Sequence, residues 1–104
     1  MSHLPSPYQR FQAEHAAVWE AYNHLGAAVH GAGPLDDRAR ALVKLGMAIA
    51  ARQEGGVHSQ VRKALEVGLT ADEIRHAVLL AIPTIGFPAT MAALTWAEDV
   101  LAQD

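Results

Sequence analysis

The residues best suited to chemistry lie in one short segment, ARQEGGVHSQVRKAL, at positions 51–65. Glu54 and His58 are four residues apart, so on a helix a carboxylate and an imidazole would share one face with Arg62. Such a pair could relay a proton or supply two metal ligands, but two ligands do not make a metal site. Ordinary ion pairs on a solvated helix face would explain the same spacing. We therefore expect no metal, and Glu54 and His58 are the candidate catalytic residues.

A second set of candidates could bind a substrate rather than transform it. Gln53, Gly56 and Gln60 are spaced at i, i+3 and i+7 and would share one helical face, whereas His58 lies about 200° around the axis from Gln60. A glutamine can orient a ligand, or it can satisfy a buried polar partner, but it cannot act as a general base. The Gly55-Gly56 pair allows close backbone approach at a helix start, where free amides favour a carboxylate, although it would serve equally as a tight turn.

The elements that must position these residues are helices. Apolar residues recur at intervals of three and four, and no segment shows sustained alternation, so the sequence predicts an all-α fold of about five helices. The first expected helix covers residues 8–29, with a bend near Gly26, and the second is capped by Asp36 or Asp37 and runs through 49. The third begins at 55 or 56 and stops at Gly68, and the fourth is capped by Thr70 and Glu73 and runs to Pro83. The fifth covers residues 88–100. Phe87, between Gly86 and Pro88, is a candidate for the mouth of a substrate pocket.

Composition narrows the functional classes. The 104 residues, 51% of them apolar and 18% charged, fit one globular domain over 1–104, and so short a chain gains burial by self-association. The net charge of −3 does not favour nucleic acid, and no apolar run is long enough to span a membrane. The N-terminus does not resemble a signal peptide, so we expect a cytoplasmic protein. The absence of cysteine excludes thiol catalysis.

Residues 35–89 resemble the carboxymuconolactone decarboxylase and alkylhydroperoxidase D-like superfamily. The resemblance is carried by QVRKAL at 60–65, GLTADEI at 68–74 and GFPA at 86–89, in that order along the chain. It implies a small all-helical domain that assembles as a homotrimer or homohexamer. We expect the apolar sides of the first, fourth and fifth helices to form the subunit contacts.

The redox members of this superfamily carry a Cys-x-x-Cys-x-x-x-His motif and a glutamate on the preceding helix. Gln53, Gly56 and Gln60 stand where the two cysteines and the histidine would be, and Ala41 stands where the glutamate would be. The resemblance therefore implies a protein that is not a thiol peroxidase, but a cofactor-free lyase or a protein that binds a small carboxylate or lactone. The alternative is a catalytically silent oligomeric module for binding or scaffolding.

Overall fold

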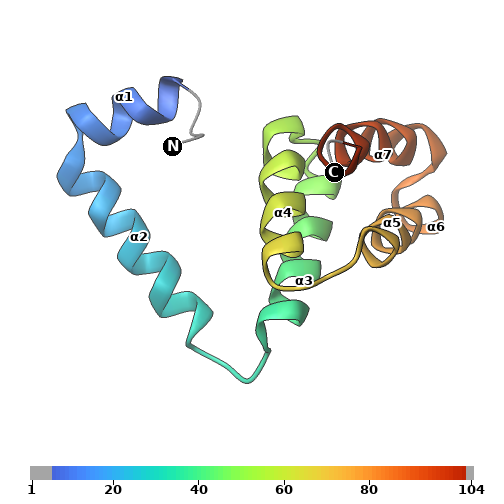
Figure 1. Cartoon of the computed structure of the whole chain (residues 1–104), viewed down its shortest axis with the longest axis horizontal. Coiled ribbons are helices and arrows are strands. Elements are labelled where there is room, and N and C mark those ends of the chain that lie inside the picture. Colours follow the sequence, from blue (N-terminus) through green and yellow to red (C-terminus); the bar gives the residue numbers. More distant parts are fainter. Residues whose placement is uncertain (1–5, 103–104) are drawn as a thin grey trace. The chain divides into compact units, whose positions relative to one another are not determined.

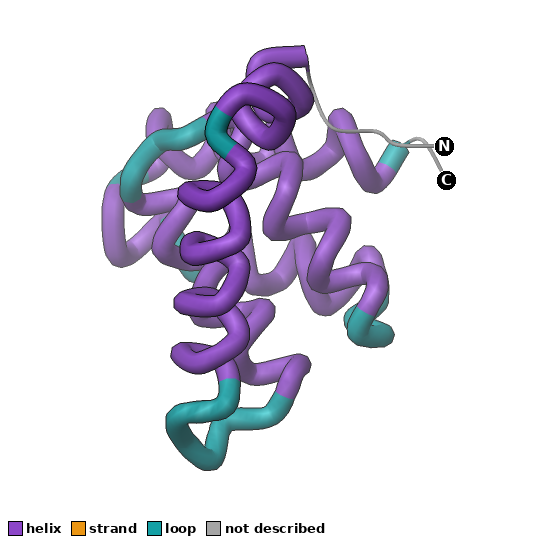
Figure 2. The backbone as a smooth tube through the Cα atoms, turned by 90° about the vertical axis from the view of Figure 1, so that its left-hand side faces the viewer, coloured by secondary structure: helices purple, strands orange, loops and turns teal. Residues whose placement is uncertain are grey.

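The computed structural model describes residues 6–102, and every regular element in that range is a helix (Figure 2). The helices are α1 (Ser6–Glu14), α2 (Ala16–His30), α3 (Asp37–Ala50), α4 (Glu54–Glu66), α5 (Ala71–Leu79), α6 (Ile82–Ile85) and α7 (Phe87–Leu101). The predicted all-α fold is confirmed. The chain divides into two compact units, Met1–Pro34 and Leu35–Asp104, and its assignment to one domain stays a prediction.

The first unit contains α1 and α2, where one long helix was expected. The chain breaks between them at His15, which has φ −133° and ψ 53°. Gly26 lies inside α2, away from both ends of that helix. The break in the predicted first helix therefore lies at His15 and not at Gly26. The side chains that flank the break remain in contact, since the Phe11 ring centroid is 5.1 Å from that of His15 and 6.3 Å from that of Trp19.

The second unit contains α3 to α7 and every buried side chain among residues 6–102. α3 and α4 lie side by side, and α4 and α5 both pack against α7 (Figure 1). The largest completely buried apolar side chains are Leu45 from α3, Val57 and Val61 from α4, and Ile74 and Val78 from α5. Alanines complete the core where helices approach closely, as Ala64 on α4 and Ala93 and Ala97 on α7 do. The interior of this unit therefore holds α4 firmly against α7.

Local signals in the sequence set most of the helix boundaries. The Asp36 carboxylate accepts a hydrogen bond from the Ala39 amide at 2.9 Å, and Thr70 forms the expected reciprocal capping box with Glu73. Gly68 has a φ of 92° and terminates α4 as predicted. The region around Pro83 differs from the expectation, because α5 ends at Leu79 and Pro83 lies in the first turn of a short additional helix, α6.

Two ion pairs connect α5 to its neighbours. Arg38 on α3 donates to Glu73 at 2.8 Å, and Arg75 donates to the two carboxylate oxygens of Glu98 on α7 at 2.7 and 3.0 Å. The backbone amide of Thr70, followed by Arg38, lowers the pKa of Glu73, and hydrogen bonding to Arg75 lowers the pKa of Glu98. Among the described residues no helix is both long and apolar enough to cross a membrane.

Candidate functional site

The turn that delivers the chain to the candidate site is built around a strained residue. Arg52 has a φ of 56°, the left-handed region that usually requires glycine. The amide of Arg52 bonds to the Ile49 carbonyl at 3.0 Å, and the amide of Gln53 bonds to the Ala48 carbonyl at 3.2 Å. These two bonds form a Schellman motif that ends α3 and turns the chain directly into α4.

The first turn of α4 explains why glycine occupies position 56. A Cβ atom there would lie 3.2 Å from both Cβ and Oε1 of Gln53, and 3.4 Å from Cβ of Ala48, so even alanine would crowd the turn. Position 55 faces open space and imposes no such limit. Gln53 is the N-cap residue, but its side chain makes no capping hydrogen bond. In contrast to α3 and α5, α4 therefore begins without a side-chain cap on its free amides.

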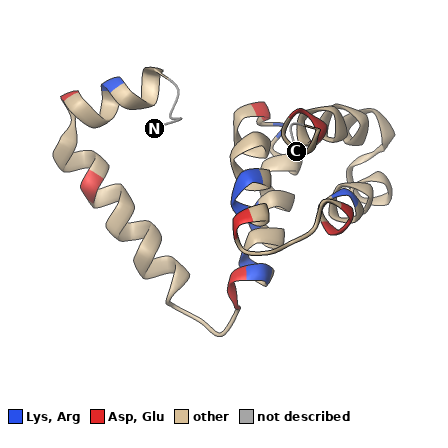
Figure 3. Cartoon of the chain, viewed as in Figure 1, with Lys and Arg blue, Asp and Glu red and all other residues tan. Residues whose placement is uncertain are grey.

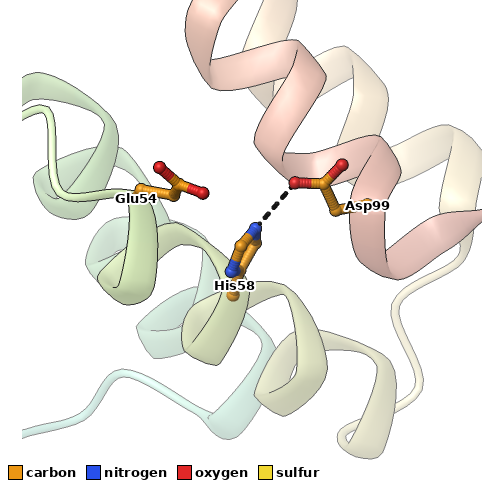
Figure 4. A group of neighbouring side chains, drawn as sticks. All are labelled: Glu54, His58 and Asp99. Carbon is orange, nitrogen blue, oxygen red and sulfur yellow. Dashed lines mark hydrogen bonds and ion pairs between the residues drawn. The ribbon is translucent and has the colours of Figure 1, made fainter.

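One turn further along α4, His58 contacts a residue from the other end of the unit. Its Nε2 atom lies 2.9 Å from Oδ2 of Asp99 on α7, and the His58 side chain keeps 23% of its exposure while that of Asp99 keeps 50%. Glu54 is exposed, and its carboxylate, the His58 ring and the Asp99 carboxylate offer atoms that all lie within 4.8 Å of one another. Figure 4 shows both carboxylates turned toward the same edge of the imidazole ring. A histidine and two acids thus form one cluster at the surface.

The contact with Asp99 fixes the protonation pattern of a neutral His58. An ionised carboxylate only accepts hydrogen bonds, so Nε2 must carry the proton that Asp99 accepts, and Nδ1 keeps its lone pair. A histidine held in this way by a carboxylate can take a proton and then hold the resulting charge, as the histidine of a catalytic triad does. Because the chain contains no cysteine, the cluster has no thiol to activate.

The structure brings together only some of the residues that the sequence suggested. Glu54 and His58 share the α4 face, and Gln53 and Gly56 are adjacent at the helix start. Gln60 is half-buried further along α4. Phe87 is exposed at the first residue of α7, about 18 Å from Asp99 along the helix axis at about 1.5 Å per residue. Phe87 and the histidine cluster therefore lie at opposite ends of α7.

A shallow open depression runs along α7 and reaches Asp99. Its lining residues are Met91, Leu94, Thr95, Glu98, Asp99 and Ala102. The lining is mostly apolar, and its acidic end is formed by Glu98, which is paired with Arg75, and by Asp99, which is paired with His58. Neither Gln53 nor Gln60 lines this depression.

Asp99 and Arg52 are the two residues of this region that sequence reasoning missed. Asp99 lies 41 positions from His58, and no local pattern connects the two. The one signal in the sequence is the apolar spacing of Ala93, Ala97 and Val100, which marks the face of α7 that packs in the same core as Val57 of α4. A left-handed arginine has no sequence signature, because glycine and asparagine are the residues expected there.

Comparison with known proteins agrees with this architecture. The model of the family described as "Carboxymuconolactone decarboxylase family" matches residues 14–99. One similar solved structure is a carboxymuconolactone decarboxylase family protein from Legionella pneumophila, with a TM-score of 0.79 and 16% sequence identity over 94% of this chain and 87% of that chain. No curated protein sequence matches the chain. At this identity the solved structure speaks for the fold alone.

Proposed function

Because the chain belongs to the carboxymuconolactone decarboxylase family, we propose that it binds a small carboxylate or lactone and moves a proton to or from it through His58. The observation that carries this proposal is the 2.9 Å contact between His58 and Asp99, which orients the ring and leaves Nδ1 available. Loss of CO₂ leaves a carbanion, and attack of water on a lactone leaves an oxygen anion, and each must receive a proton. Neutral His58 can take a proton from water at Nδ1 and then, as the imidazolium cation, donate it to that atom. Glu54 would serve as the second proton carrier.

The start of α4 supplies a binding site for the substrate anion. The amides of the first turn lack a side-chain cap and carry the positive end of the helix dipole, which favours a carboxylate, whereas the negative charge of Glu54 in the same turn opposes it. The backbone at Gly55 is open, and the side chain of Gln53 lies against Gly56, so an amide group borders the same turn. Gln60 is half-buried one turn beyond Gly56, but it lies about 200° around the helix axis from His58, so it would not contact the part of the ligand that His58 protonates. No cofactor enters this scheme.

The experiment is to measure ligand binding and turnover with small carboxylates and lactones. We expect a ligand of one of these classes to raise the melting temperature of the protein, since binding to the native state stabilises it by mass action. His58→Gln should lower turnover by about 10²- to 10⁴-fold, the usual contribution of a general acid or base. His76→Gln, at an exposed histidine on α5, is the matched control and should retain activity. Full turnover in His58→Gln, or no binding by either class, would refute the proposal.

A second candidate, a silent oligomeric module, is favoured by the first unit. Several of its large apolar side chains are exposed, namely Tyr8, Phe11, Val18, Tyr22, Leu25 and Val29. We propose that these side chains join copies of the chain in a homotrimer or homohexamer, because contiguous apolar surface usually marks an interface. Tyr22→Glu should then lower the mass measured by light scattering, whereas Glu20→Gln, on the same helix, should not. A monomeric wild-type protein at all concentrations would exclude self-association.

A further inference from the structure

We propose that Glu54, His58 and Asp99 form a binding site for a divalent transition-metal cation such as Zn²⁺. The potential ligand atoms of the three side chains all lie within 4.8 Å of one another (Figure 4). The inference goes beyond the proposed function, because it assigns the same cluster a second ligand and does not depend on any substrate or reaction.

The scaffold beneath the cluster is rigid enough to present three ligands together. Glu54 and His58 are separated by one turn of α4, the spacing that lets two side chains of a helix bind one metal ion. Asp99 comes from α7, which packs against α4 in the core. The neighbours of these ligands, Val57 on α4 and Val100 on α7, are buried and fix the two helices in place.

The distances leave only a small adjustment for the side chains. Zinc bonds to histidine nitrogen and carboxylate oxygen are about 2.0–2.2 Å long, so ligand atoms around a tetrahedral ion lie about 3.4 Å apart. Glu54 is exposed and no hydrogen bond holds its carboxylate among the described contacts, so rotation about its side-chain bonds can close the remaining distance.

The charges of the cluster favour a dication. With a neutral His58, the carboxylates of Glu54 and Asp99 bring two negative charges to the same edge of the ring. A divalent ion between them would neutralise both and remove their mutual repulsion. One nitrogen and two oxygen ligands suit borderline ions such as Zn²⁺, Co²⁺ or Ni²⁺ better than Mg²⁺, which prefers oxygen alone.

Metal binding and proton transfer would exclude one another at this site. A metal ion at Nε2 requires the lone pair of that nitrogen, so the proton that Nε2 donates to Asp99 must leave the atom. In the neutral ring that proton then resides on Nδ1, which loses its capacity as a base. Zn²⁺ would therefore inhibit any reaction in which His58 carries a proton, and would leave coordination positions open to water because the cluster is exposed.

The test uses the purified full-length protein after EDTA has removed any bound metal. ZnCl₂ is titrated into it, and isothermal titration calorimetry measures the binding. We expect one Zn²⁺ per chain, with an affinity reduced at least tenfold in each of His58→Asn, Asp99→Asn and Glu54→Gln. The matched controls are His76→Asn and Glu66→Gln, at exposed positions on α5 and α4, and both should bind Zn²⁺ as the unchanged protein does. Excess MgCl₂ should not displace the zinc.

A second measurement separates metal binding from folding and from the proposed reaction. Bound Co²⁺ should give visible absorption bands that are lost in Glu54→Gln, an exposed variant whose melting temperature in EDTA should match that of the unchanged protein. Absence of zinc binding, or binding that survives both His58→Asn and Asp99→Asn, would overturn the inference. So would equal losses in the control variants, which would indicate adventitious binding. A failed metal titration would leave turnover in EDTA, the readout of the proposed function, unaffected.

Discussion

The two units of the chain have similar helical spacing of apolar residues, but these side chains are mostly exposed in the first unit, whereas many of them are buried in the second. In α2, Tyr22 is 67% exposed and Leu25 is 60% exposed, whereas Leu45 in α3 and Ile74 in α5 are completely buried. Charge does not compensate for this exposure, since Figure 3 shows a single charged band on α2, and the sequence there contains one charged residue, Glu20. Helical periodicity therefore tells which side chains share a face, but not what covers that face.

This difference has a thermodynamic consequence. Neither α1 nor α2 contains a buried residue, so the first unit gains little of the stabilisation that apolar burial gives, about 25 cal/mol per Å². A helix of 15 residues, the length of α2, is marginal in water by itself. The second unit carries its own core and does not share this weakness. The proposed self-association would bury the exposed apolar side chains of the first unit and so stabilise it.

The largest expected contrast between the units is the effect of removing an apolar side chain. Leu45→Ala should lower the free energy of unfolding by about 2–5 kcal/mol, because it leaves a cavity in the core. Leu25→Ala should change it by less than about 0.5 kcal/mol in dilute, dissociated protein, since Leu25 is exposed there. Urea denaturation followed by circular dichroism measures both. Equal losses in dilute protein would mean that the two units share one core.

Glycine substitutions should show a smaller contrast. Gly86, between α6 and α7, has φ 99° and ψ 158°, a conformation open essentially to glycine alone, so Gly86→Ala should cost about 1–3 kcal/mol. Gly26, inside α2, faces open space, and Gly26→Ala should stabilise that helix by about 0.5–1 kcal/mol. Thermal unfolding would measure the first change and helix content the second. A destabilising Gly26→Ala would place a second chain against that face of α2.

The smallest expected effect is the response of the second unit to acid. The pKa values of Glu73 and Glu98 are lowered in the folded protein. Their contribution to the free energy of unfolding is therefore present above the ordinary carboxylate pKa of 4.5, and it is lost as the pH falls through the folded pKa values. Stability should therefore decline below about pH 4.5. Glu98→Gln should lower the free energy of unfolding at neutral pH and make its decline below pH 4.5 less steep, whereas Glu66→Gln should leave the decline unchanged. If stability declined as steeply in Glu98→Gln as in the unchanged protein, Glu98 would not be a source of the acid dependence.

Local chemistry made several features predictable from sequence. The caps at Asp36 and Thr70 and the glycine stop at Gly68 each depend on residues within a few positions of one another, so the structure could confirm them. The absence of cysteine removed thiol chemistry without any need for coordinates. The break at His15 was not predictable in this way, because the apolar period continues across it and gives no sign of the change in ψ.

The sequence by itself determined the helical class, most helix boundaries and the family, since each depends on periodicity, short-range hydrogen bonding or motif order. It also placed Glu54 and His58 on one helical face, because four residues make about one turn. Only the tertiary structure joined them to Asp99, 41 residues beyond His58, through the packing of α4 against α7. The reason is physical: helix-to-helix packing depends on the fit of whole apolar faces, and no single stretch of the chain contains that information.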